Sequence, residues 1–95
     1  MGDREYVEIT EFVSGITFRF YTDRNQPHRL HLALRGVEPE TAIGVYFDDR
    51  GERVWIAEKR CFETRTDVYV LAWLQMAPQH ILVITCVPRD QSQPE

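Results

Sequence analysis

The sequence predicts an α+β fold in which an antiparallel sheet carries two short helices packed on one face. Two stretches rich in β-branched and aromatic residues, 67–76 and 80–87, are separated by a short connection. Residues 16–22 alternate apolar and polar side chains, which is typical of a half-buried strand. Two further segments, 27–36 and 37–51, space their apolar residues as helices do.

Composition indicates one small globular domain. The chain has 95 residues, of which 43% are hydrophobic and 27% charged, with a net charge of −4. We expect a single domain over residues 1–87 and a flexible tail over 88–95, where "PRDQSQPE" holds little apolar content. No apolar run approaches the roughly 20 residues of a membrane helix, and the start "MGDREYVE" does not resemble a secretory signal. These features predict a cytoplasmic protein without membrane association.

Near the N-terminus, "YVEITEFV" (residues 6–13) fits two structures. It is either a strand joined to 16–22 by a tight Ser14-Gly15 turn, or a helix that begins at Asp3 and is closed by Gly15. We favour the strand, because it would pair directly with the alternating segment that follows.

In the C-terminal half, "DVYVLAWLQM" (67–76) and "HILVITCV" (80–87) predict a central antiparallel pair joined through Ala77-Pro78-Gln79. "GERVWIAE" (51–58) predicts a third strand. "EKRCFETR" (58–65) is rich in charge, and we interpret it as a charged edge or loop. His80, which follows the hairpin connection, is expected to be an exposed turn residue.

The middle of the chain is compatible with either secondary structure. As a helix, "PHRLHLALRG" (27–36) has Pro27 in its first turn, an apolar stripe and Gly36 as its stop. The next helix would open at Pro39 beside two glutamates and end near Gly51. As strands, the same residues alternate, and the fold becomes an all-β small sandwich or barrel of about seven strands.

The residues offer little to hold a metal or an organic cofactor, and we predict neither. Cys61 and Cys86 are 25 positions apart with no CxxC spacing, which favours two reduced thiols. His28 and His31 have the spacing of two ligands on one helical turn, but only His80 remains to complete a zinc site. No nucleophile elbow, dinucleotide fingerprint or P-loop is present.

"LRGVEPETAI" (34–43) resembles the signature of small BrnT-like proteins, in particular a sister family of undefined function within the RelE-like toxin superfamily. Those proteins have a His- and Arg-bearing helix, an Arg-Gly turn and a second helix that opens with acidic residues. The terminal segments "VYVLAW" (68–73) and "ILVITCVPRD" (81–90) are also similar to the family's closing strand pair. The resemblance covers about half of the chain, and it implies an endoribonuclease toxin of a toxin-antitoxin system.

A role carried over from that family attaches to His28, His31 and Arg35. Metal-free RNA cleavage needs a base for the 2′-hydroxyl, an acid for the leaving oxygen and a cation for the phosphorane, and these three side chains can supply them. On a helix they share the face opposite the leucines. The alternative is that they form the solvated face that every amphipathic helix has. As a strand, the segment would place His28 on the leucine face instead.

Two function classes follow from the sequence. The first is a noncatalytic interaction module that self-associates or binds a protein partner through an exposed strand edge, which the acidic net charge and the lack of a catalytic motif favour. The second is the BrnT/RelE-like ribonuclease, for which RNA would be the substrate. The acidic balance counts against nonspecific binding of nucleic acid.

Overall fold

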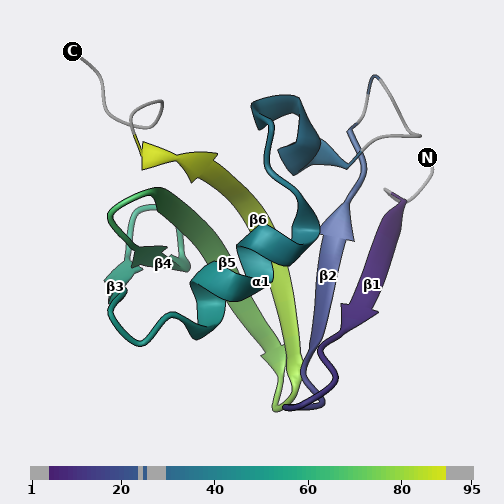
Figure 1. The fold of residues 1–95 in the computed structure, drawn as a ribbon, viewed down its shortest axis with the longest axis horizontal. Coiled ribbons are helices and arrows are strands. Elements are labelled where there is room, and N and C mark those ends of the chain that lie inside the picture. Colours follow the sequence, from purple (N-terminus) through teal and green to yellow (C-terminus); the bar gives the residue numbers. More distant parts are fainter. Residues whose placement is uncertain (1–4, 24, 26–29, 90–95) are drawn as a thin grey trace.

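A single six-stranded sheet in the order β1-β2-β6-β5-β4-β3 organises the molecule (Figure 1). The computed structural model describes residues 5–23, 25 and 30–89, with the side chains of residues 34 and 35 left out. The elements follow the chain as β1 (Tyr6–Thr10), β2 (Thr17–Tyr21), the 3₁₀ helix η1 (His31–Arg35), α1 (Pro39–Phe47), β3 (Glu52–Ile56), β4 (Cys61–Arg65), β5 (Tyr69–Ala77) and β6 (His80–Pro88).

The sheet is mixed, whereas the sequence predicted an antiparallel one. β2 pairs with β6 in parallel, with Phe18 opposite Ile81 and Phe20 opposite Val83, and the other strand pairs are antiparallel. Periodicity within a strand carries no information about the direction of its neighbour, so this pairing lay beyond the sequence argument. The predicted α+β class fits the structure only loosely, because strands make up most of the fold.

The prediction of two short helices is wrong for the first helix. Residues 31–35 form a short 3₁₀ helix instead of an α-helix, and Gly36 N bonds to Ala33 O at its end. Gly36 then adopts φ 74° and turns the chain away, as a left-handed stop does. The second helix is α1, which starts at Pro39 and buries Ala42, Ile43 and Val45.

A strand within the predicted segment 6–13 is confirmed, but it ends at Thr10, and residues 11–16 form a longer turn than the expected Ser14-Gly15 turn. The strands predicted over 16–22, 51–58 and the C-terminal pair are also confirmed. The interpretation of residues 58–65 as an edge or loop is wrong, because β4 lies inside the sheet between β3 and β5. Its Glu63 and Arg65 bond to each other on one face while Phe62 and Thr64 point to the other. β6 reaches Pro88, and residues 90–95 of the expected tail lie outside the described residues.

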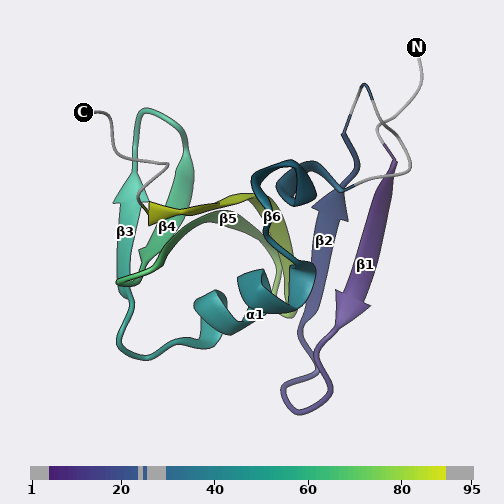
Figure 2. The same ribbon diagram turned by 45° about the horizontal axis from the view of Figure 1, so that its top comes forward.

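The core lies between the sheet and the two helical elements, which both sit on the same side of it (Figure 2). Phe18, Phe20, Leu71, Trp73 and Ile81 face this side from the central strands. Leu32 from η1, Val37 from the connection and Ile43 from α1 complete the cluster on the other side of the core. On the opposite side of the sheet, which we call the open face, none of the described residues forms a helix. Among the described residues, no helix is both long and apolar enough to cross a membrane.

Candidate functional site on the open face

Of the three predicted site residues, the structure describes the side chain of His31 alone. His28 lies outside the described residues, and so does the side chain of Arg35. His31 lies on η1, where its Nδ1 is 3.8 Å from Oδ1 of Asp23. Leu30, which precedes η1, has an extended backbone, so His31 does not belong to a helix that runs without a break from residue 27.

The open face carries a groove among the described residues. It has a volume of about 590 Å³, within the range of ligand pockets. It runs along the whole of β4 and over the halves of β5 and β6 that lie farther from the β5–β6 turn, and we call it the open-face groove. Its lining residues are Lys59, Cys61, Glu63, Arg65, Val70, Ala72, Ile84, Thr85, Val87 and Arg89.

A β-bulge in β6 helps to shape this groove. Ala72 pairs with Thr85 and the next residue, Trp73, pairs with Val83, so Ile84 has no partner in β5. An extra residue bends a strand and disturbs its alternation. Ile84 and Thr85 both line the groove as a result, and Ile84 remains 42% exposed.

The groove combines an apolar floor with a mainly basic rim. Lys59, Arg65 and Arg89 contribute three cations against the single carboxylate of Glu63. Glu63 is held from two sides, since Arg65 Nη2 donates to its Oε1 at 2.9 Å and Lys59 Nζ lies 3.7 Å from its Oε2. Arg89 Nη1 donates to Thr66 O at 2.8 Å, which fixes this side chain at the groove's end.

Cys61 lines the groove but is almost fully buried. Burial raises the pKa of its thiol, the charge of Glu63 raises it further, and Lys59 offsets part of the effect. A protonated thiol is a weak nucleophile, so Cys61 contributes apolar surface rather than chemistry.

A second polar group on the open face joins three strands. Glu8 on β1 accepts a hydrogen bond at Oε2 from Arg19 Nε on β2, at 3.0 Å. The same Oε2 lies 2.8 Å from His80 Nε2 on β6. The Arg19 hydrogen bond, followed by that of His80, holds the pKa of Glu8 below its ordinary value. The Arg19 guanidinium also stacks 4.0 Å from the centre of the Tyr6 ring. We call Glu8, Arg19 and His80 the Glu8 cluster.

Sequence reasoning missed both features. The structure sets Glu8 opposite Arg19 because Thr10 pairs with Thr17 and residues 11–16 form the turn. The tight Ser14-Gly15 turn expected from the sequence would instead set Glu8 opposite Tyr21. The position of His80 depends on the parallel pairing of β2 with β6, which the sequence did not predict. His80 was expected to be an exposed turn residue, but it begins β6 and is only partly exposed.

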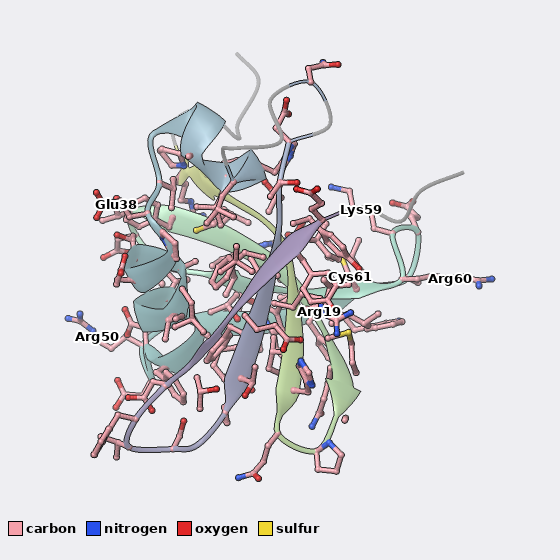
Figure 3. All side chains as sticks on the ribbon, turned by 90° about the vertical axis from the view of Figure 1, so that its right-hand side faces the viewer. Arg19, Glu38, Arg50, Lys59, Arg60 and Cys61 are labelled. Atoms are coloured by element: carbon pink, nitrogen blue, oxygen red, sulfur yellow. The ribbon has the colours of Figure 1, made fainter. Side chains whose placement is uncertain are left out.

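Charge differs between the two sides of the molecule. Arg19 and Cys61 lie on the open face, while Glu38 and Arg50 lie on the side of α1 (Figure 3). The segment around α1 carries mainly acidic side chains, namely Glu38, Glu40, Asp48 and Asp49 against Arg50 and Arg53. The groove is therefore locally basic although the net charge of the chain is negative.

Comparison of the chain with models of protein families, with curated proteins and with solved structures finds no match.

Proposed function

We propose that this chain is a noncatalytic interaction module that binds a protein partner through the open-face groove. The groove itself carries the proposal, because it is a hollow with an apolar floor and a charged rim on a sheet face that neither η1 nor α1 covers. Apolar surface that is rimmed by polar side chains is a feature of many protein–protein contact sites. The sequence favours a strand edge for binding, and the groove offers a more specific surface on the same sheet.

The groove's chemistry favours an acidic segment with apolar side chains. Val70, Ala72 and Ile84 would pack against apolar groups, and Lys59, Arg65 and Arg89 would attract carboxylates. A volume of about 590 Å³ accommodates a few side chains. The partner is therefore expected to insert a short segment of its chain.

A pair of synthetic peptides tests this proposal. One alternates leucine or phenylalanine with glutamate, and its control replaces each glutamate with lysine. We expect the acidic peptide to shift the backbone amide resonances of Cys61, Ala72 and Thr85 in ¹⁵N–¹H spectra, and the basic peptide to leave them in place. Equal effects of both peptides, or none from either, would contradict the proposal.

A second function, metal-free RNA cleavage, is supported by the Glu8 cluster and by the resemblance to BrnT-like toxins. A carboxylate, an imidazole and a guanidinium lie together in this cluster. RNA cleavage needs a general base, a general acid and a cation that stabilises the phosphorane, and these three groups can supply them. Tyr6 is about half exposed beside Arg19 and offers a ring on which a base can stack.

This second function is tested by expressing the protein and following growth and cellular RNA. If the Glu8 cluster is the site, Glu8→Gln and His80→Asn should each relieve growth arrest while His31→Ala does not. If the residues predicted from the sequence are the site, the outcome reverses. Intact RNA and normal growth with the unaltered chain would eliminate the ribonuclease function and leave the interaction module.

A further inference from the structure

The turn between β1 and β2 presents two apolar side chains to solvent. Phe12 is 97% exposed and Val13 is 88% exposed, the two highest values among the exposed large hydrophobic residues of the structure. We call this pair the apolar tip. Single exposed apolar residues are common on protein surfaces, but adjacent ones with almost no contact to their own chain mark candidate contact sites.

The turn that carries the apolar tip is held by its own hydrogen bonds. Glu11 N bonds to Ile16 O at 2.8 Å, and Gly15 N bonds to Glu11 O at 2.9 Å. The Glu11 carboxylate accepts the Ser14 N–H at 2.7 Å, and the Ser14 hydroxyl accepts the Ile16 N–H at 3.1 Å. Gly15 supplies the left-handed φ of 75° that the turn needs. An apolar pair on an ordered turn loses little conformational entropy when it is bound.

The charge beside the apolar tip indicates which kind of surface the tip binds. Glu11 is the only charged residue between Thr10 and Thr17, and neither Lys nor Arg flanks the tip. Segments that dock on anionic lipid surfaces carry basic residues beside their apolar ones. The tip therefore suits a protein surface with an apolar hollow and nearby cations.

The open-face groove has these properties, but it lies too far away to receive the tip of its own chain. The β1–β2 turn lies at the same end of the sheet as the β5–β6 turn, as the hydrogen bond from Thr17 N to Gln79 O shows. The groove reaches Val87 and Arg89 near the other end of β6 (Figure 1). A contact between tip and groove consequently requires two molecules.

We infer that the apolar tip of one molecule docks in the open-face groove of a second copy, so that the chain associates head to tail. Phe12 and Val13 meet the floor of Val70, Ala72 and Ile84, and Glu11 meets the basic rim. This inference rests on the proposed function and names the protein partner as another copy. Because the two surfaces differ, each molecule keeps one free tip and one free groove, and association continues beyond a dimer.

Complementation between two variants tests this arrangement. Phe12→Ser/Val13→Ser removes the tip and keeps the groove, and Ile84→Glu places a carboxylate in the groove and keeps the tip. In sedimentation equilibrium, the unaltered chain should rise above twice its monomer mass of 11.2 kDa as concentration increases. Each variant alone should remain a monomer. Their equimolar mixture should form a complex of twice the monomer mass and stop there.

The control is Val68→Ser, which removes an exposed apolar side chain outside the groove and should associate like the unaltered chain. Circular dichroism verifies that the variants fold. A monomeric unaltered chain at all concentrations, or two variants that do not combine, would overturn the inference. So would tip-dependent binding to neutral lipid vesicles without self-association. Acidic-peptide binding in the groove would still stand in either case, which separates the two proposals.

Discussion

His80 Nε2 lies 2.8 Å from Oε2 of Glu8, a residue 72 positions earlier in the chain. Together with the Arg19–Glu8 ion pair at 3.0 Å, this contact joins β6 to β1 across the intervening strand β2. One carboxylate thus links three strands on the open face.

The first prediction concerns the charge of Glu8. Its pKa is lowered from 4.5 in the folded protein by Arg19 and then His80, so the ionised carboxylate stabilises the fold above that value. This stabilisation is lost as pH falls through the folded pKa. Glu8→Gln should therefore lower the melting temperature at neutral pH and have little effect in acid. Glu52→Gln, an exposed glutamate on β3, serves as the control. An equal loss at both pH values would show that the carboxylate's charge is not responsible.

The second prediction concerns a buried hydrogen bond. Trp73 Nε1 donates to Thr64 Oγ1 at 2.9 Å, and both residues are buried. Thr64→Val keeps the shape of the side chain but leaves the indole N–H without an acceptor, which should lower the free energy of unfolding by about 1–3 kcal/mol. Urea denaturation measures this loss. In a Trp73→Phe background the same change should cost much less, and an undiminished cost would refute the role of the bond.

The third prediction compares two glycines. Gly44 lies exposed within α1, where an added Cβ meets nothing within 4 Å. Gly44→Ala should stabilise the fold by about 0.5–1 kcal/mol, because alanine is the better helix former. At Gly51, a Cβ would lie 2.8 Å from Cγ2 of the buried Thr64. Gly51→Ala should therefore destabilise the fold. Equal thermal shifts for the two variants would contradict this packing.

The fourth prediction concerns the thiols. Burial raises the pKa of Cys86 to about 12, and Cys61 is also buried with a raised pKa. Neither should react quickly with a disulfide reagent at mildly alkaline pH, whereas both should react after denaturation. Cys61, which lines the groove, should react first, and the acidic peptide should slow it. Faster reaction of Cys86 would show that the core opens before the groove does.

Sequence patterns identified most strands because their alternation is visible without knowledge of their neighbours. Thr17–Tyr21 and the β5–β6 hairpin belong to this group. β4 was missed because its side chains do not alternate clearly between apolar and polar. The side that faces the core includes the polar Thr64, and the open-face side includes the buried Cys61 beside charged residues.

The candidate site was harder to predict from the sequence than the strands were. His31 was assigned to the face of an α-helix, but η1 is a short 3₁₀ helix between a β-region residue, Leu30, and the left-handed Gly36. The groove depends on a bulge at Ile84 and on residues from three strands. Such features arise from register and long-range pairing, which local periodicity does not encode.

The parallel pairing of β2 with β6 has a consequence for synthesis on the ribosome. Thr17–Phe20 cannot take their places in the sheet until residues 80–83 have been made, while β3 to β6 follow one another as adjacent antiparallel strands. Pairings that are distant in sequence form slowly, and partly folded chains expose unpaired strands. The β1–β2 hairpin therefore lacks its partner strand β6 while the nascent chain grows, and the sheet becomes continuous only after β6 leaves the exit tunnel.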